Sequence, residues 1–408
     1  MSQLLPNQQT ARAHLLPHKV GALFMKMGTG KTRVAVELVN SVPELDLAVY
    51  IAPLRSIVPT EPNVTSIKEE VAKWGGFHAK ETIFIGVETI GQSDRQYLKL
   101  FAKLQVTPKC FLICDESIKI KNLTAKRTQR LLELSQMTEY KLILNGSPVT
   151  RDLLDLYPQM QFLSPKILNM SLPQFKDTFC KYTRITKRFG GYREYTKEFI
   201  TGYENIDYLY SIIGNYIYEC DLDLQVRQLY TEKRYTIDSE AKEEYSRLKN
   251  KYLDDEKLMA MNNNIFLEMT MKMQHEYCCT ESKFESVAEW LKTYDESKTI
   301  IFCKYIDSAD ECRRRFPKAT VLNYKTGAFS LNLQHLPYTV YFDRTFDYGD
   351  VIQASHRNYR TGQEYDVRYL NLTGDVGLEN MMKDNNDKKL SMAEYFKTIS
   401  KKQLKEVL

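Results

Sequence analysis

Several features that would place a chain in a special class are missing from this sequence. No apolar run among the 408 residues approaches the roughly 20 residues that a membrane-spanning helix needs, so we expect no membrane contact. The segment Met1–Arg12 is polar and rich in glutamine, and it lacks the apolar core of a secretory signal peptide. No internal repeat or low-complexity tract is visible. These absences favour an ordinary globular protein.

Cysteine is present, but not in an arrangement that suggests a metal site or a disulfide framework. The eight cysteines are scattered, and no C-x-x-C pair or Cys/His group has zinc spacing. We therefore expect reduced thiols, no zinc and a cytoplasmic location, in a bacterium or a phage-infected host cell. The net charge of +5 permits nucleic-acid binding without arguing for it.

Residues 1–164 alternate apolar strands with helical stretches. The strand candidates are Ala22–Met25, Ala48–Ala52, Thr82–Gly86, Phe111–Cys114 and Lys141–Leu144. Buried apolar strands that alternate with helices predict an α/β fold with a parallel, doubly wound sheet, which binds ligands at the carboxyl ends of its strands. We expect a first lobe over 1–164.

Alternation is lost over 165–225, where aromatic and basic residues become frequent. Thr183–Phe189 and Tyr192–Thr196 flank a Gly-Gly pair, which predicts a β-hairpin in an accessory segment. Residues 238–295 look helical. Strand candidates then return at Thr299–Cys303, Thr320–Leu322, Thr339–Phe342 and Val367–Leu370, and predict a second α/β lobe over 226–408.

A phosphate-binding loop is the first candidate site. The strand Ala22–Met25 leads through a glycine turn into a helix that begins near Lys31. Backbone N–H groups of such a turn can surround phosphate oxygens, the Lys31 ammonium can reach the β- and γ-phosphates, and the Thr32 hydroxyl can bind Mg²⁺. Because Met25 occupies the position of the first glycine in the strict pattern, a plain strand-to-helix turn without nucleotide binding remains the alternative interpretation. The candidate ATP-binding residues here are Gly28, Thr29, Gly30, Lys31 and Thr32.

A pair of carboxylates is the second candidate. The apolar strand Phe111–Cys114 runs into Asp115 and Glu116. At the carboxyl edge of the sheet, Asp115 can hold Mg²⁺, and Glu116 can orient and deprotonate the water that attacks the γ-phosphate. An exposed acidic strand end is the alternative when the pair is taken alone. The polar turn Asn145–Ser147 follows the next strand and could sense the γ-phosphate.

Two arginines form the third candidate. Arg357 and Arg360 are three residues apart in Gln353–Gln363, so on a helix they would share a face. Forked guanidinium donors stabilise the negative charge of a phosphoryl group in transfer. Such arginine fingers are useful only if the second lobe closes onto the first.

Together these segments resemble the superfamily 2 nucleic-acid helicases and, within them, the Swi/Snf-like DNA translocases. The segments similar to motifs I, Ia, II, III, IV, V and VI are, in that order, Met27–Thr32, Tyr50–Leu54, Asp115–Asn122, Leu144–Pro148, Thr299–Cys303, Gly327–Gln334 and Gln353–Gln363. Motif II resembles the form D-E-A-H-R-I-K-N, and motif VI the form Q-A-x-x-R-x-x-R-x-G-Q. The chain departs from the family at three positions: Ile118 replaces the usual His, His356 the usual Asp and Tyr359 the usual His. These departures put the details of the coupling between the lobes in doubt.

The resemblance implies two RecA-like P-loop lobes and an ATP hydrolase that requires Mg²⁺. Leu5–Gln8 is similar to the adenine-reading L-x-P-x-Q element, with Gln8 as the base contact. The residues expected to act in catalysis are Glu116, Lys31, Arg357, Arg360 and Gln353. The compact size resembles phage or bacterial members that remodel branched DNA, so we expect an ATP-dependent DNA helicase or translocase acting on forked, branched or duplex DNA.

DNA contacts are expected in both lobes and in the hairpin. The resemblance places lobe contacts at Pro53, Leu54, Arg55, Lys304, Tyr305, Lys325 and Thr326. In the hairpin, basic and aromatic residues alternate, so basic groups could hold phosphates while aromatic rings stack on unpaired bases. The candidates there are Arg184, Lys187, Arg188, Phe189 and Tyr192, with Phe189 and Tyr192 expected at a DNA fork. A packed hairpin with a solvated basic face is the alternative.

Two rival functions stay open at this stage. One is an RNA-directed helicase of the same superfamily, although the forms of motifs II and VI speak against it. The other is a DNA-binding scaffold with an inactive ATP site, although all the catalytic side chains are present. In addition, the family has a helix and a strand where Tyr324 is followed by Lys325, so either this protein is shorter there or a segment is absent from the sequence.

Overall fold

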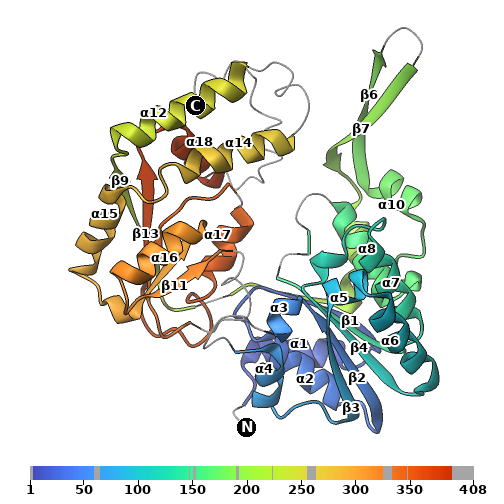
Figure 1. Cartoon of the computed structure of the whole chain (residues 1–408). Coiled ribbons are helices and arrows are strands. Elements are labelled where there is room, and N and C mark those ends of the chain that lie inside the picture. Colours follow the sequence, from blue (N-terminus) through green and yellow to red (C-terminus); the bar gives the residue numbers. More distant parts are fainter. Residues whose placement is uncertain are drawn as a thin grey trace. The chain divides into compact units, whose positions relative to one another are not determined.

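The computed structural model contains two compact units, Met1–Leu222 and Asp223–Leu408, which are described one at a time. It describes residues 3–58, 65–146, 148–149, 153–189, 193–222, 224–254, 263–324, 333–346 and 348–387; within these, the side chains of 184–189, 193–199, 252–254 and 263–267 are not described. The predicted α/β class is confirmed, since each unit is built on a parallel sheet flanked by helices (Figure 1).

The first unit is centred on a six-stranded parallel sheet with the strand order β3-β2-β4-β5-β1-β8. Its strands are β1 (Val20–Met25), β2 (Leu45–Ala52), β3 (Ala79–Gly86), β4 (Cys110–Asp115), β5 (Tyr140–Leu144) and β8 (Ile217–Cys220). Its helices are α1 (Pro6–Leu15), α2 (Lys31–Asn40), α3 (Leu54–Ile57), α4 (Ile67–Lys73), α5 (Val87–Gln92), α6 (Asp94–Val106), α7 (Lys126–Gln136), α8 (Leu156–Leu163), α9 (Pro165–Leu168), α10 (Leu172–Phe179) and α11 (Ile206–Ile213). All five predicted strands are therefore present, and β8 is an addition.

Both faces of this sheet are buried. Along β1, Ala22 and Phe24 belong to one hydrophobic core, whereas Leu23 and Met25 belong to the other. Successive residues of a strand point to opposite faces, so helices must cover both sides. A capping box helps to fix one of these helices: Glu69 N donates to Ser66 Oγ (3.2 Å) at the start of α4, and Ser66 N donates to the Glu69 carboxylate (2.6 Å).

The segment predicted as an accessory region is largely part of the first unit. Phe175 of α10 and Leu209 and Ile213 of α11 lie in the same hydrophobic core as Ala22, and β8 pairs with β1. The predicted hairpin is confirmed as β6 (Cys180–Phe189) and β7 (Arg193–Tyr203), which form a separate antiparallel sheet. In Figure 1 the hairpin extends beyond α10 and away from the main sheet.

The second unit contains a five-stranded parallel sheet with the order β11-β10-β12-β13-β9. Its strands are β9 (Gln228–Tyr235), β10 (Thr299–Cys303), β11 (Thr320–Asn323), β12 (Tyr338–Tyr341) and β13 (Val367–Gly374). Its helices are α12 (Ser239–Asp254), α14 (Asn263–His275), α15 (Glu281–Leu291), α16 (Ile306–Arg315), α17 (Tyr348–Ser355) and α18 (Gly377–Asp387). The four predicted strands and the helical region are confirmed, and β9 is an addition.

The two faces of this second sheet are buried in different ways. One face carries the aliphatic and aromatic core of α14, α15, α16 and α18. The other carries stacked rings: Tyr230 on Tyr369 (4.6 Å between centroids), Tyr369 on Tyr341 (5.7 Å), Tyr341 on Phe302 (6.1 Å) and Phe302 on Tyr324 (5.5 Å). Such pairs add about 0.5–1.5 kcal/mol each beyond the burial of apolar area.

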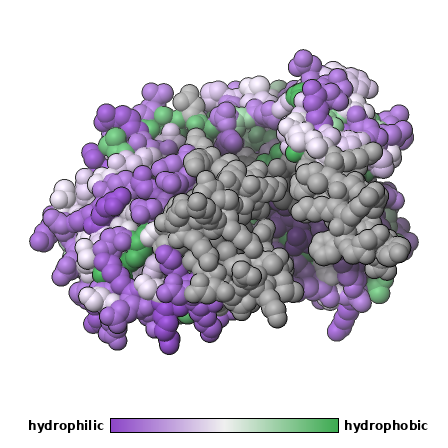
Figure 2. Space-filling model, turned by 90° about the horizontal axis from the view of Figure 1, so that it is seen from above, coloured by the Kyte–Doolittle hydropathy of each residue, from purple (hydrophilic) through white to green (hydrophobic). Residues whose placement is uncertain are grey.

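Figure 2 shows the hydropathy of one face of the molecule. On this face the described residues are mainly hydrophilic, and hydrophobic residues form only small, scattered spots. In the part of the chain that the structure describes, no helix combines the length and the apolar character needed to cross a membrane.

Lys141 on β5 is a buried cation, and we expect its removal to stabilise the protein. Only 9% of the residue is exposed, its ammonium donates to Ser135 O (3.1 Å), and burial lowers its pKa to about 8. At pH 7 the lysine is charged in both the folded and the unfolded state, so the folded state bears the desolvation cost. Lys141→Met should therefore raise the free energy of unfolding at pH 7 by about 1–3 kcal/mol. Ser135 O keeps its bond from Thr138 Oγ1 (3.2 Å).

Urea unfolding at several pH values checks this expectation. Between the folded pKa of about 8 and the unfolded value near 10.4, the unfolded state binds more protons, so wild-type stability should rise with pH there. The advantage of Lys141→Met should shrink over the same window. Lys99→Met, the same change at an exposed site on α6, should stay within about 0.5 kcal/mol of wild type. A destabilised Lys141→Met variant at pH 7 would contradict the argument.

Candidate nucleotide site and nucleic-acid contacts

The predicted phosphate-binding loop lies between β1 and α2. Gly28 and Gly30 have φ angles of 83° and 85°, in the left-handed region that glycine adopts without strain. A Cβ at position 30 would lie 2.2 Å from Gln8 Nε2, so a larger residue there would displace the end of the Gln8 side chain. Met25 is the last residue of β1 and is fully buried. The glycine of the strict pattern is therefore replaced by a core residue of the strand.

Gln8 supports this loop from α1. The residue is 3% exposed; its Nε2 donates to Thr29 O (3.1 Å), and its Oε1 accepts a bond from Leu5 N (3.1 Å). Thr29 is fully buried, and its hydroxyl donates to Lys26 O (2.7 Å). The structure thus places Gln8 against the loop, and its contact with adenine stays a prediction.

Lys31 and Thr32 open α2 and face the end of β4. The Lys31 ammonium donates to Met25 O (2.8 Å), and a Cβ on Gly146 of the predicted polar turn would lie 3.8 Å from the same Nζ atom. The positive charge of Lys31 also lowers the pKa of Asp115, which opposes the increase that burial causes. The loop, the carboxylate strand and the polar turn are therefore brought together at one edge of the first sheet, as their places at strand ends predicted.

Tyr50 links the two predicted Mg²⁺ ligands and was not found from the sequence. Its hydroxyl donates to Asp115 Oδ2 (3.0 Å), and the Thr32 side chain hydrogen bonds to Tyr50. Tyr50 is fully buried on β2, and burial together with the negative charge of Asp115 raises its pKa well above the ordinary value. It therefore stays a protonated donor that holds the carboxylate in place.

The two carboxylates at the end of β4 differ in environment. Asp115 Oδ1 accepts a bond from Glu116 N (2.9 Å), and burial, with Glu116 as a second cause, raises the pKa of Asp115 to about 6. Glu116 has a φ of 49°, a conformation that costs non-glycine residues about 1–3 kcal/mol and that clusters at functional sites. The backbone thus leaves the extended conformation of β4 at Glu116, directly after Asp115.

A buried network joins the residue after Glu116 to the polar turn. Ser117 Oγ donates to Gln159 Oε1 (2.6 Å), and Asn145 Nδ2 lies 3.4 Å from both of these oxygens. Gln159 Nε2 donates in turn to Pro148 O (2.7 Å) and Asp155 O (2.8 Å). Gln159 is fully buried on α8, so it ties motifs II and III together. Its only signal in the sequence is an uncharged polar residue within an apolar helix.

The residues of this edge fit ATP and Mg²⁺. A glycine turn whose N–H groups open a helix suits phosphate oxygens, and a cationic Lys31 stands beside it. The hydroxyl of Thr32 and the buried carboxylate of Asp115 are oxygen ligands of the kind Mg²⁺ prefers. Glu116 adds a carboxylate that can take a proton from water.

The predicted arginines of the second unit are not on a helix, which corrects the expectation. Gln353 lies on α17, but this helix ends at Ser355, and the chain continues in tight turns with Arg357 N donating to Ala354 O (3.1 Å) and Gln363 N to Arg360 O (3.0 Å). Arg357 is 6% exposed and Arg360 is half-buried.

Asn358 fixes the turn segment that follows the helix. This fully buried side chain donates to Leu336 O (3.0 Å) and Thr339 Oγ1 (2.9 Å), and its backbone oxygen accepts a bond from Gln363 Nε2 (3.2 Å). Gly362 has a φ of 95°, which a continuous helix excludes. Asn358 thus fixes the segment that holds both arginines, a role that the sequence did not reveal.

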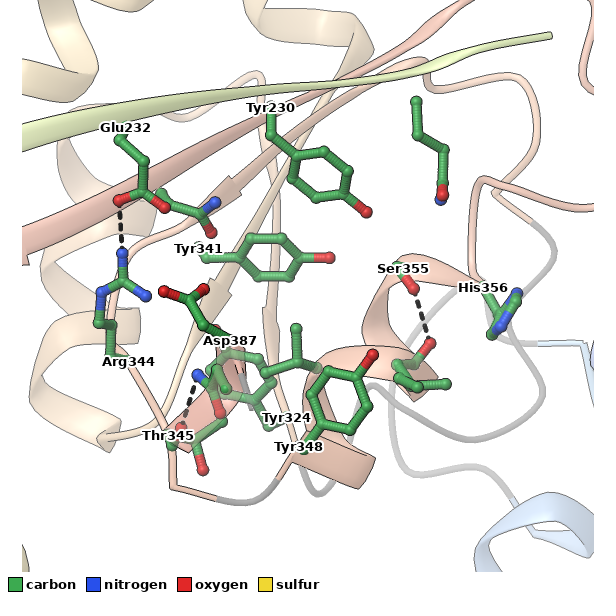
Figure 3. Close-up of a pocket in the computed structure, with 15 residues that line it drawn as sticks. Tyr230, Glu232, Tyr324, Tyr341, Arg344, Thr345, Tyr348, Ser355, His356 and Asp387 are labelled. Carbon is green, nitrogen blue, oxygen red and sulfur yellow. Dashed lines mark hydrogen bonds and ion pairs between the residues drawn. The ribbon is translucent and has the colours of Figure 1, made fainter. Parts of the chain in front are cut away.

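A cavity of about 450 Å³ lies beside α17 in the second unit (Figure 3). Tyr230 and Tyr341 line it from the sheet, and Tyr348 and Ser355 line it from α17. Arg344 forms an ion pair with Glu232 (2.6 Å) at another side of the cavity. Nothing in the sequence analysis pointed to this cavity.

The predicted DNA-contacting residues fall into three groups. On the first unit, Pro53 is buried, while Leu54 and Arg55 are exposed on α3. On the second unit, Lys304 Nζ and Tyr305 Oη donate to Gln274 Oε1 (2.7 and 3.0 Å), so both side chains are directed toward α14. The remaining candidates are Arg184, Lys187, Arg188 and Phe189, whose side chains are not described, and Tyr192, Lys325 and Thr326, which lie outside the described residues. These contacts stay predictions.

Comparison with known proteins assigns the chain to a family. Residues 63–283, more than half of the 408, match the SNF2-related domain. The chain belongs to the SNF2-related domain family. This confirms the Swi/Snf-like resemblance that the motifs indicated. The match includes the carboxylates of β4, the polar turn and the hairpin.

Individual relatives are similar over parts of this SNF2-family chain. The helicase domino of Drosophila melanogaster is 38% identical over 91 residues, which are 22% of this chain and 3% of that protein. The DNA repair and recombination protein RAD54B is 29% identical over 173 residues in Gallus gallus (37% of this chain, 18% of that protein) and 37% over 68 residues in Homo sapiens (17% and 7%). The matches thus span less than a fifth of each relative. The Sulfolobus solfataricus SWI2/SNF2 ATPase core in complex with dsDNA aligns with 100% of this chain and 97% of its own, at a TM-score of 0.43 and 18% identity.

Proposed function

We propose that this SNF2-family ATPase core hydrolyses ATP to move along DNA and to remodel forked or branched DNA. The observation that supports it most is the arrangement at one sheet edge of the first unit. There the glycine loop, Lys31, Thr32 and the Asp115–Glu116 pair come together in a chain of the SNF2-related domain family. The RAD54B relatives are named for DNA repair and recombination, which favours a role in the same processes.

Each residue of the site has a distinct part in this proposal. The loop N–H groups and Lys31 bind the phosphates, while Thr32 and Asp115 hold Mg²⁺. Bound Mg·ATP supplies the γ-phosphoryl group that is transferred to water. Glu116 orients that water and takes its proton. Tyr50 keeps Asp115 oriented, and Gln159 carries changes at Ser117 to the polar turn.

The second unit contributes charge stabilisation in this proposal. Arg357 and Arg360, with Gln353 before them, stabilise the negative charge that spreads over the transferred group. Repeated closure with ATP and opening after hydrolysis would move the two units along one strand. We expect the first unit to contact DNA phosphates and not base edges, because a motor must pass over any DNA sequence. The exposed Arg55 on α3 is suited to such a contact.

Steady-state ATPase assays with different nucleic acids test this function. We expect duplex DNA to stimulate hydrolysis more than RNA does, and Lys31→Ala to abolish the stimulated activity because the phosphates lose their cation. Displacement of a third strand from a DNA triplex would then report movement along the duplex. Stronger stimulation by RNA would favour the RNA-directed rival. DNA binding without any stimulated ATPase activity would favour the scaffold.

A further inference from the structure

The register of the β6–β7 hairpin divides its residues into two chemically different faces. Residues that are directly opposite each other in an antiparallel pair lie on the same face, and successive residues alternate between the faces. The pairing is continuous from Tyr182↔Ile200 to Phe189↔Arg193. The face of each residue in this part of the hairpin therefore follows from the backbone alone.

One of these faces is electrically balanced. Its facing pairs are Tyr182↔Ile200, Arg184↔Glu198, Thr186↔Thr196 and Arg188↔Glu194. Both arginines stand opposite a glutamate, so their charges cancel within the face. We call this the neutral face. Arg184 and Arg188, which the sequence suggested as DNA contacts, belong to it.

The other face carries cations and no acidic residue. Its facing pairs are Thr183↔Phe199, Ile185↔Lys197, Lys187↔Tyr195 and Phe189↔Arg193. Every cation stands opposite an aromatic or aliphatic residue, and along β7 the order is Arg193, Tyr195, Lys197 and Phe199. Cations and aromatic residues thus alternate along β7, and two of the three cations, Lys187 and Arg193, also stand opposite an aromatic residue. We call this the cationic face.

Such an alternation of cations and aromatic residues is chemically complementary to a single-stranded nucleic acid. Residues two apart on a strand are about 7 Å apart, so cations and aromatic residues recur at that interval. Proteins that hold an unpaired strand combine cations along its backbone with aromatic rings on which its bases stack. An acidic protein surface would use the cations but would have no use for the aromatic residues between them.

The base of the hairpin is anchored in the first unit. Tyr182 Oη donates to Asp177 Oδ1 (2.8 Å) on α10, and Asn205 Nδ2 donates to Thr178 O (2.7 Å). The Glu204 N–H donates to Phe179 O (3.0 Å) at the same place. From this base the strands extend beyond α10 (Figure 1). The outer part of the hairpin is therefore carried on a fixed support.

We propose that the cationic face, through Lys187, Phe189, Arg193, Tyr195 and Lys197, binds the unpaired DNA strand at a fork or branch. This inference rests on the proposed function and specifies the part of the branched substrate that the hairpin holds. The neutral face has no part in it, so the two faces provide a matched test within one hairpin.

Equilibrium binding of forked DNA with one labelled single-stranded arm tests the inference in the full chain. Lys187→Ala with Arg193→Ala should weaken fork binding and reduce the slope of log K against log salt by about 1.4, because each lost single-strand phosphate contact removes about 0.7. Phe189→Ala with Tyr195→Ala should weaken binding by roughly tenfold for each base that no longer stacks, without changing the slope. Arg184→Ala with Arg188→Ala removes as many cations from the neutral face and should bind forks as wild type does.

The outcomes separate this inference from the proposed function. Equal losses in the two charge variants would overturn it, because net charge alone would then explain fork binding. Wild-type fork binding in both cationic-face variants would also overturn it. Duplex-stimulated ATPase activity of the wild-type chain is measured in parallel: its absence refutes the proposed motor, whereas its presence with a failed face test refutes only the role of the hairpin.

Discussion

Replacing Glu116 with glutamine should reduce the rate of ATP hydrolysis by about 10²–10⁴-fold while nucleotide binding persists. The amide has nearly the shape of the carboxylate and can still orient water, but it cannot accept the proton that water loses. Glu116 follows Asp115 directly, and its φ of 49° bends the chain away from the strand. The side chain lies near enough to Asp115, the carboxylate that we assign to Mg²⁺, for its charge to raise the Asp115 pKa.

Single-turnover hydrolysis and the affinity for a fluorescent ATP analogue, measured on the same samples, check this result. Asp115→Asn is the informative comparison, because it should lower the Mg²⁺-dependent affinity itself. Glu139→Gln, a change on the exposed Glu139 side chain (57% exposed), should alter neither quantity. If Glu116→Gln hydrolyses ATP at the wild-type rate, another group must be the base, and the assignment of roles to the two carboxylates fails.

The sequence predicted the central strands of both sheets because burial on both faces leaves an apolar run. The run Cys110–Asp115 is such a case, with five buried residues before its final carboxylate. The two strands that were missed lack this signal. The edge strand β9 is mostly half-buried or exposed, and only one of the four residues of β8 is buried. Their places depend on neighbours that are distant in the sequence.

The sequence indicated the candidate residues that lie at this edge of the sheet, but not the residues that position them. Loop glycines and paired carboxylates have short-range signatures. Tyr50 contacts Asp115 only because Tyr50 on β2 pairs with Ile113 on β4, and this register cannot be obtained from either strand alone. Gln159 acquires its role in the same way, through the packing of α8 against the polar turn.

The expectation for the arginines was wrong for a related reason. A spacing of three residues indicates a shared face only while the helix continues. Here α17 ends at Ser355, and the buried Asn358 and the left-handed Gly362 hold the following segment in a non-helical path that has no periodic signal in the sequence. The hairpin was predicted correctly from the Gly-Gly pair in the sequence, whereas its two chemically different faces required the observed register.

Replacing Arg357 with alanine should lower DNA-stimulated ATP hydrolysis by about 10³–10⁵-fold, the range expected for an arginine that stabilises phosphoryl transfer. The side chain belongs to the second unit, whereas the phosphate loop belongs to the first. Loss of hydrolysis with retained nucleotide affinity would therefore show that catalysis requires both units. Because Arg357 is 6% exposed, alanine also removes buried side-chain volume, which lowers stability.

Arg357→Lys separates these two effects. Lysine keeps the positive charge and most of the side-chain volume but lacks the planar, forked donors, so it should preserve the unfolding temperature and still lose most of the hydrolysis rate. Arg360→Lys should have the same kind of effect if the two arginines act together. Arg313→Ala removes an exposed arginine of the same unit, one that pairs with Asp310 (2.8 Å), and should leave both quantities unchanged. Wild-type turnover in Arg357→Lys would mean that charge alone suffices at this position and that no forked contact with the transferred phosphoryl is made.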